Sequence, residues 1–249
     1  MRMSGRADAV AALALGFVKL LVGAAVEFLD IGVVVGAVAE SREFPVHSTV
    51  LTGARMPALI EVSTGADMIV LGRRGMGGLR GLLLGSTSST LVQHAHCPVA
   101  VIHADRPDGG LSATAPVVVG VDGSPASESA TAIAFDEASR RGVDLTAVHT
   151  WMNSADFPFD VATDELATQA DEELAQRLAG WCERYPDVTV HRVVGQDNPA
   201  HRLIEESWTA QLLVVGSHGR GGFAGLLLGS VGSAVVHAAR IPVIVARRP

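Results

Sequence analysis

The sequence is poor in lysine and cysteine, and each shortage excludes a class of protein. Lys19 is the only lysine and the formal net charge is −7, so no basic surface for nucleic acid is expected. The two cysteines, Cys97 and Cys182, lie far apart and outside any C-x-x-C pattern. This usage argues against a disulfide framework or a zinc knuckle and is typical of a reducing compartment.

Long uninterrupted apolar runs are also missing, although 48% of the residues are hydrophobic. The most apolar stretch, residues 9–39, is broken by Lys19, Glu27 and Asp30, which leaves no clean run of about 18 residues for a membrane span. No A-x-A-like cleavage site follows at the distance that a secretory signal requires. The sequence therefore predicts a cytoplasmic protein without a membrane partner.

Two common nucleotide-binding motifs are absent. No G-x-x-x-x-G-K-[ST] occurs, which excludes a P-loop NTPase, and the strand at 117–121 is not followed by G-x-G-x-x-G, which argues against a nicotinamide dinucleotide fold. The sequence contains an internal repeat instead. Residues 66–102 superimpose without a gap on residues 210–246, with eighteen of the 37 positions identical at an offset of 144. Such self-similarity indicates a duplicated domain.

The repeat predicts two domains, 1–104 and 116–249, joined by a linker at 105–115 that is rich in Pro, Gly, Ser and Ala. The second copy alternates short β-branched runs with amphipathic stretches, which predicts an α/β fold: two tandem, doubly wound (Rossmann-like) domains with parallel sheets. Ser124-Pro125 and Asn198-Pro199 are typical helix starts. Strands are expected at 117–121, 145–151, 188–194, 212–215 and 242–246, with helices between them.

A glycine-rich loop follows the strand at 212–215. Gly216 and Gly219 are followed by nine residues and then by Gly229-Ser230, which opens a helix. A phosphate chain needs several backbone N–H groups at close range, and glycine has no Cβ to block the approach. The helix start adds free N–H donors and the positive end of the helix dipole. The first copy repeats this spacing over residues 72–86.

A carboxylate is expected beside that loop. Asp122 follows the strand at 117–121, and in a doubly wound sheet ligands bind outside the carboxyl ends of the strands. Its oxygens accept hydrogen bonds, which suits a ribose hydroxyl or the amine of a purine. The histidines on strands, His149 and His191, are expected to be core or edge residues. The group His94, His96 and Cys97 lacks a fourth ligand, so no metal site is predicted there.

The pattern G-x-x-G, nine residues, then G-[ST], preceded by a strand that ends V-G-V-D-G-S, resembles the universal stress protein family, and the chain resembles its tandem mycobacterial members. The resemblance covers residues 116–249 and about 46–104. It implies a five-stranded parallel sheet and ATP binding, with magnesium on the phosphates. The implied phosphate contacts are Gly216, Gly219, Gly229 and Ser230, with His218 nearby. At the other end of the site, Asp122 contacts the ribose and adenine, Gly120 and Val121 line the same side of the pocket, and Thr150 offers backbone groups to the adenine. Val215 and Val231 also lie near the nucleotide.

The resemblance also implies that the last strands pair, Val99–Ile102 with Val243–Ala246, within one chain or between the chains of a homodimer. Two departures are expected to matter. Gly232 stands where the family often has a hydroxyl residue, which removes one phosphate contact. At the repeat offset nothing corresponds to residues 117–144, so the first domain is expected to lack its first strand, its first helix and the counterpart of Asp122, and not to bind ATP normally.

These features predict a non-catalytic ATP-binding protein, a stress or dormancy regulator with an unknown regulatory protein partner. No positioned general base or metal-binding carboxylate pair marks a catalytic residue. Two alternatives stay open at this point. One is a slow ATPase or an adenylyl-transfer or nucleotide-hydrolysing enzyme of related fold, and the other is an interaction module with an empty loop.

Overall fold

The computed structural model describes residues 20–23, 33–36, 48–51, 54–72, 84–103, 112–151, 163–220 and 228–247. The chain divides into two compact units, residues 1–106 with the terminal Pro249, and residues 107–248. This division falls inside the linker expected at 105–115, of which the first seven residues lie outside the described part. The two units are described separately.

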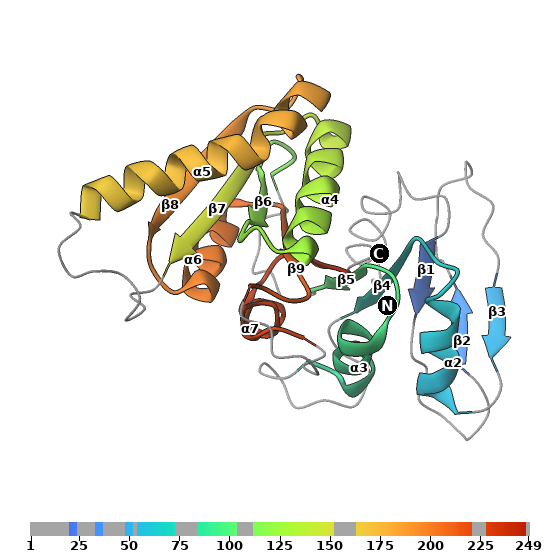
Figure 1. The fold of residues 1–249 in the computed structure, drawn as a ribbon. Coiled ribbons are helices and arrows are strands. Elements are labelled where there is room, and N and C mark those ends of the chain that lie inside the picture. The colour runs from blue at the N-terminus through green and yellow to red at the C-terminus, as the bar shows by residue number, and fades with distance from the viewer. Residues whose placement is uncertain are drawn as a thin grey trace. The chain divides into compact units, whose positions relative to one another are not determined.

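The second unit contains a five-stranded parallel sheet in the order β10-β9-β6-β7-β8 (Figure 1). The order reverses between β6 and β9, and such a switch point opens a crevice at the carboxyl ends of the two strands. Sequence analysis predicted this α/β class, and the parallel pairing of all five strands confirms it. The strands are β6 (Val117–Gly120), β7 (Leu145–Trp151), β8 (Val190–Gln196), β9 (Leu212–Gly216) and β10 (Val243–Ala246).

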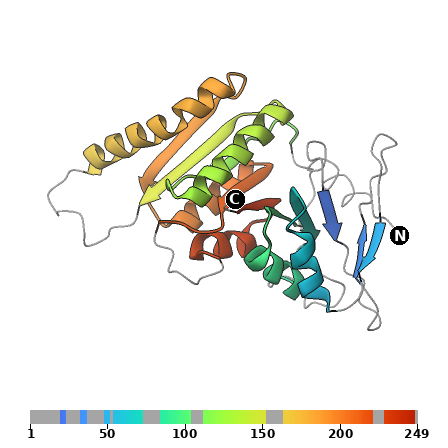
Figure 2. The ribbon, with the colours of Figure 1, turned by 45° about the vertical axis from the view of Figure 1, so that its right-hand side comes forward.

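Helices cover both faces of this sheet. Figures 1 and 2 show α4 and α5 on one face and α6 and α7 on the other. Phe135 of α4 stacks on Trp181 of α5 with ring centroids 5.9 Å apart, so these two helices pack against each other. The short 3₁₀ helix η1 (Ser207–Thr209) follows α6. The helices are α4 (Pro125–Arg141), α5 (Thr163–Arg184), α6 (Pro199–Glu206) and α7 (Ser230–Ala238).

Local sequence accounts for the helix starts. Ser124 Oγ accepts a hydrogen bond from Ser127 N at 3.2 Å, and Asn198 Oδ1 accepts one from Ala200 N at 3.0 Å. Both helices carry proline in their first turn, where no N–H is needed. The strand predicted at 188–194 spans Val190–Gln196, so both of its boundaries are wrong by two residues. At its start, Val188 N donates to Tyr185 O and completes the turn that ends α5. β8 therefore begins at Val190.

Burial on both faces explains the apolar runs of the strands. Val117, Leu145, Leu212 and Ile244 are each fully buried. A strand that is covered by helices on both sides has no solvent face, so its sequence shows no alternation of polar and apolar residues.

The first unit has a mixed sheet in the order β3-β2-β1-β4-β5. β1 lies parallel to β4 and β4 parallel to β5, while β2 is antiparallel to both β1 and β3. Sequence analysis expected a parallel sheet in this unit as well, and the two antiparallel pairs show that this expectation is wrong for β2 and β3. The elements are β1 (Leu20–Gly23), β2 (Val33–Gly36), β3 (Ser48–Leu51), α2 (Arg55–Val62), β4 (Met68–Gly72), α3 (Ser86–His94) and β5 (Val99–Ile102).

Connection length explains the difference. Only residues 24–32 separate β1 from β2, whereas residues 121–144 separate β6 from β7. A parallel crossover needs a dozen or more residues, so nine residues favour an antiparallel return. β1 takes the position beside β4 that β6 takes beside β9, with Leu20 opposite Met68 as Val117 is opposite Leu212. The truncation of the first domain stays a prediction, but a strand does lie at that position in the sheet.

Among the helices of the described residues, none combines the length and apolar character that crossing a membrane requires. Part of each glycine-rich loop lies outside the described part: residues 73–83 in the first unit, which include Gly75, and residues 221–227 in the second. Arg73 and Arg74, the counterparts of Ser217 and His218 at the repeat offset, fall among them.

Candidate functional site

The turn after β6 joins Asp122 to the glycine loop. Asp122 Oδ1 accepts a hydrogen bond from Ser124 N at 2.9 Å, and Oδ2 accepts one from Arg220 N at 3.2 Å. The Arg220 guanidinium also donates to the backbone carbonyl of Asp122. A carboxylate offers about four lone-pair positions, so Asp122 retains acceptor capacity for a ligand hydroxyl.

Tight backbone packing determines two of the predicted glycines. A Cβ at Gly216 would lie 2.8 Å from the backbone carbon of Ala126 in the first turn of α4. A Cβ at Gly120 would lie 3.1 Å from Leu203 Cδ1, and Val215 packs on the same side. Gly216 therefore packs directly against the α4 backbone and Gly120 against the Leu203 side chain of α6, so both glycines have a packing reason for their identity.

The two glycines of the loop have a different environment. A Cβ at Gly219 would lie 2.5 Å from Asp122 Oδ2, so Gly219 must be glycine for the carboxylate to reach the loop. Gly229 N donates to Ser217 O at 2.7 Å, which closes the loop on itself, and Ser124 Oγ donates to His218 O at 3.1 Å. His218 is half-buried. The structure thus brings Asp122, His218, Gly219 and Gly229 together.

Helix α7 begins without a side-chain cap. Its N-cap residue is Gly229, whereas α4 and α6 are capped by Ser124 and Asn198. The first N–H groups of a helix have no partner within the helix, and glycine supplies no oxygen for them. Ser230 is exposed and Val231 half-buried at this end of the helix. The start of α7 can therefore accept an anion.

Thr150 lies on the strand next to β6. Val148 O accepts from Val121 N, while Trp151 O accepts from Asp197 N beyond β8, so the backbone groups of alternate β7 residues point to opposite neighbours. Thr150 is two residues after Val148, so its N–H and C=O also point to the β6 side. The last pair between β6 and β7 is Gly120 with Val148, so Thr150 lies beyond the paired part of β6. Its Oγ1 is buried and has no hydrogen-bond partner among the described residues. A buried hydroxyl without a partner is costly, so this position favours a ligand that bonds to it.

The strand histidines have structural partners. His149 Nδ1 lies 2.6 Å from Val121 O and ties the end of β7 to the β6 turn, while His191 Nε2 lies 2.7 Å from Asp144 Oδ2 at the exposed edge. Sequence reasoning missed two arginines. Arg220 holds the Asp122 turn, and the guanidinium of Arg177 on α5 lies against Gly123, which has a φ of +76°. Nothing in the spacing of these residues signals their approach, because it depends on how α5 and the loop pack.

The hydroxyl that Gly232 lacks has a clear role in the other copy. Ser88, its counterpart at the repeat offset, donates from Oγ to Gly72 O at 2.8 Å. Gly72 corresponds to Gly216, and a Cβ at Gly232 would lie 3.4 Å from Gly216 O. In the first unit the hydroxyl at this position therefore bonds the end of the preceding strand.

Comparison with known proteins matches the two units separately. The model of the universal stress protein family matches residues 14–103 and 114–247. A universal stress protein found in both Mycobacterium bovis and Mycobacterium tuberculosis is 55% identical over 216 residues, which cover 85% of this chain and 72% of the relative. A second such protein in both species is 54% identical over 219 residues, covering 86% of this chain and 69% of the relative.

Solved structures give the same fold. The crystal structure of a universal stress protein from Archaeoglobus fulgidus covers 84% of this chain and 69% of its own, with a TM-score of 0.56 and 23% identity. Three findings agree with one another. The family model matches two segments that together span most of the chain, the fold is a duplicated α/β architecture, and the mycobacterial relatives are more than 50% identical to this chain. The chain therefore belongs to the universal stress protein family.

Proposed function

We propose that the second unit binds ATP without catalysing its turnover, and that nucleotide occupancy regulates a stress or dormancy response. The adenine would lie beside β6 and the end of β7, where Thr150 offers backbone groups and a buried hydroxyl. Asp122 would accept a hydrogen bond from the ribose. The triphosphate would lie along Gly219 and Gly229 to Ser230, accompanied by magnesium that is bound through phosphate oxygens and water.

The start of α7 is the observation that carries this proposal. Its N-cap glycine leaves the first-turn N–H groups without a side-chain acceptor, while the other capped helices of the same unit use Ser124 and Asn198. This end of α7 follows the loop that leaves β9, at the switch point of the sheet where ligands bind in doubly wound folds. A phosphate group satisfies both the free N–H groups and the helix dipole.

The proposal also covers the cellular compartment, the pairing of the last strands and a regulatory protein partner. Cys97 is buried and Cys182 half-buried, and neither forms a disulfide, which fits a reducing cytoplasm. Pairing of β5 with β10, within the chain or between two chains of a homodimer, stays part of the proposal. So does a protein partner that distinguishes the nucleotide-bound form from the free form.

Nucleotide binding is tested by mass spectrometry of ligand released from the purified protein and by calorimetric titration with ATP. Thr150→Val replaces the unpartnered hydroxyl with a methyl group of the same shape. The loss of one hydrogen bond to the ligand should weaken ATP binding by up to about tenfold, while thermal stability is kept or raised. If Thr150→Val bound ATP with the affinity of the unmodified chain, the Thr150 hydroxyl would not be part of the proposed site.

Thr146→Val is the matched control, because Thr146 lies on the same face of β7 at its opposite end. It should leave ATP affinity unchanged. Release of phosphate or a nucleotide product from bound ATP, measured over many hours, would contradict the non-catalytic part of the proposal and favour the slow ATPase. Failure of the unmodified chain to bind any nucleotide would favour the interaction module.

A further inference from the structure

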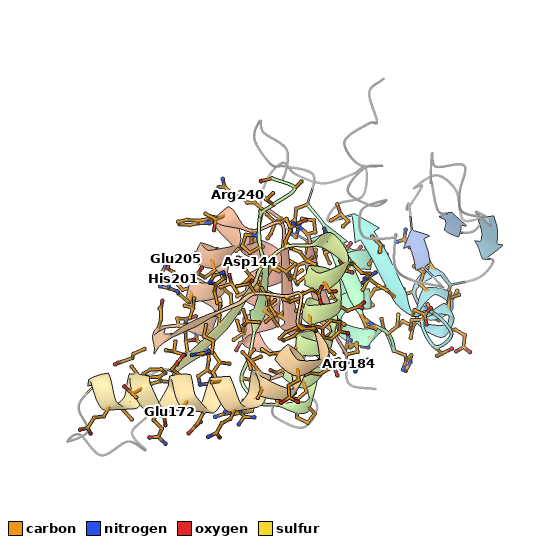
Figure 3. The ribbon with its side chains drawn as sticks, turned by 90° about the horizontal axis from the view of Figure 1, so that it is seen from above. Asp144, Glu172, Arg184, His201, Glu205 and Arg240 are labelled. Atoms are coloured by element: carbon orange, nitrogen blue, oxygen red, sulfur yellow. The ribbon has the colours of Figure 1, made fainter. Side chains whose placement is uncertain are left out.

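Three side chains of metal-ligating type lie in a row at the start of α6. Asp197 directly follows β8, and His201 and Glu205 come one and two helical turns later. Residues four apart lie on one face of a helix, so the imidazole stands between the two carboxylates. Figure 3 shows the side chains of His201 and Glu205 next to each other. Sequence analysis predicted no metal site and did not consider this group of residues.

The imidazole is not tightly bonded to either carboxylate. His201 Nδ1 lies 3.4 Å from Asp197 Oδ2, and His201 Nε2 lies 3.6 Å from Glu205 Oε1. A charge-assisted hydrogen bond is shorter, at about 2.7–2.9 Å. At the far edge of the same unit, His191 Nε2 lies at that shorter distance, 2.7 Å, from Asp144 Oδ2. The side chains of Asp197, His201 and Glu205 are therefore close enough to share an ion and too far apart for a closed hydrogen-bonded network.

The distances fit a small cation. One ligand atom from each of the three residues lies within 4.8 Å of the others. A tetrahedral zinc ion at about 2.0–2.1 Å from each ligand holds neighbouring ligand atoms about 3.3 Å apart. Because the imidazole faces the two carboxylates through different nitrogens, one side chain must rotate to close on the ion. Glu205, whose side chain is 36% exposed, has room for that rotation.

The backbone positions the first ligand in advance. Asp197 N donates to Trp151 O at 3.1 Å, and Asp197 Oδ1 accepts from Asn198 N at 2.6 Å, which leaves Oδ2 on the side of the imidazole. The N-terminal N–H groups of α6 are satisfied by Asn198, so Asp197 is not needed as the cap. At the repeat offset the first copy has Gly53, Pro57 and Glu61, and so lacks the cluster.

We propose that Asp197, His201 and Glu205 form a binding site for a first-row divalent transition-metal cation of the zinc class, with water completing its coordination. An imidazole with two carboxylates suits zinc and its neighbours, whereas magnesium and calcium take sets of oxygen ligands. The side chain of His201 is 63% exposed, so the site is open to solvent on one side. An ion held here would tie the first two turns of α6 to the end of β8.

The test is a competition titration with Zn²⁺ and a chromophoric chelator, in the absence of nucleotide, so that it is independent of the proposed ATP site. His201→Ala should weaken the binding of one zinc ion per chain by at least about tenfold. Alanine favours the helix, so the fold is expected to be kept. His191→Ala is the matched control, since it removes an exposed histidine that has a single carboxylate partner, and should leave zinc binding unchanged.

A second variant and a second measurement complete the test. Glu205→Gln keeps the size of the side chain and should also weaken zinc binding, and Zn²⁺ should raise the melting temperature of the unmodified chain but not that of His201→Ala. Equal zinc binding in the unmodified chain and His201→Ala would overturn the proposal. So would an equal loss in His201→Ala and His191→Ala, which would indicate nonspecific binding to surface histidines.

Discussion

The two glycine loops of this chain have similar sequences but different partners. In the second unit, Asp122 at the end of β6 accepts from the backbone of Arg220 in the loop. β1 has the same register beside β4 that β6 has beside β9. Counting along the sequence from that register sets Ala25, which lies outside the described part, against Asp122. The repeat offset aligns Met76 with Arg220. In sequence, these positions of the first copy therefore carry neither the carboxylate of Asp122 nor the guanidinium that donates to the Asp122 carbonyl.

We infer from this comparison that a copied loop does not by itself make a nucleotide site. The glycines and the helix start recur in both units, and α3 begins at Gly85 without a side-chain cap as α7 begins at Gly229. The residue that meets the loop comes from a strand far away in the sequence. We therefore expect one nucleotide per chain, bound to the second unit.

The strongest test of this asymmetry places an acid at each helix start. Gly229→Asp puts a carboxylate on the N–H groups that the phosphates would use, so ATP affinity should fall by at least about a hundredfold through competition and like-charge repulsion. Gly229 has a φ of −68° and a ψ of 158°, which other residues adopt readily, and aspartate is a good N-cap, so stability should be kept or raised by a few tenths of a kcal/mol.

Gly85→Asp is the control in the first unit, where the N-cap backbone has a φ of −60° and a ψ of 150°. Calorimetric titration should give the unmodified affinity and stoichiometry for this variant. A loss of binding in Gly85→Asp comparable to that in Gly229→Asp would indicate that the first unit also binds nucleotide. It would contradict the expectation that only the second unit does.

Replacing the loop arginine by its first-copy counterpart should have a smaller effect. Arg220→Met keeps the backbone N–H that bonds to Asp122 Oδ2 but removes the guanidinium contact with the Asp122 carbonyl. ATP affinity should fall by about tenfold, the effect of losing one charged hydrogen bond that positions the carboxylate. Arg240→Met, at another exposed arginine of the same unit, should bind ATP normally. Equal ATP affinities for the two variants would show that the Arg220 side chain does not contribute to ATP binding.

Exchanging the residues at the hydroxyl position should shift stability in opposite directions in the two units. Ser88→Ala removes the hydrogen bond to Gly72 O and should cost about 1 kcal/mol. Gly232→Ser can form the same bond to Gly216 O and should stabilise by less than that, because its Cβ would lie 3.2 Å from Leu228 Cδ1. Urea denaturation measures both changes. A loss of stability in Gly232→Ser would show that Leu228 cannot move aside.

The smallest effect concerns α5, which has no counterpart among the described residues of the first unit. The Arg192 guanidinium hydrogen-bonds to Asp171 and holds the pKa of that carboxyl below its usual range. A lowered pKa stabilises the fold above the ordinary aspartate range, and the contribution is lost as the pH falls through the lowered value. Because both side chains are more than a third exposed, Arg192→Gln should cost under about 1 kcal/mol at neutral pH.

The pH dependence provides the control for this pair. In urea denaturation the difference between Arg192→Gln and the unmodified chain should disappear once Asp171 is protonated in both. A difference that persisted unchanged in acid would show that Arg192 acts by packing on α5 and not through the charge of Asp171.

The contribution of the sequence to the site was uneven. Glycine spacing located the loop, and Ser124-Pro125 located the helix that follows Asp122, because both are local patterns with a local physical cause. The packing reasons for Gly120 and Gly216 were not visible, since Leu203 and Ala126 approach them from other helices. The boundary of β8 was misplaced because apolar Val188 completes a turn after α5.

The sequence by itself determined the duplication, the parallel sheet of the second unit and the family, because strand burial, helix caps and glycine spacing depend on neighbours along the chain. Only the tertiary structure decided that β1 lies beside β4, that Arg220 reaches Asp122, and that the Thr150 hydroxyl has no hydrogen-bond partner among the described residues. These features depend on which segments meet across the sheet. A one-dimensional pattern does not encode such contacts, because they arise from the packing of whole elements.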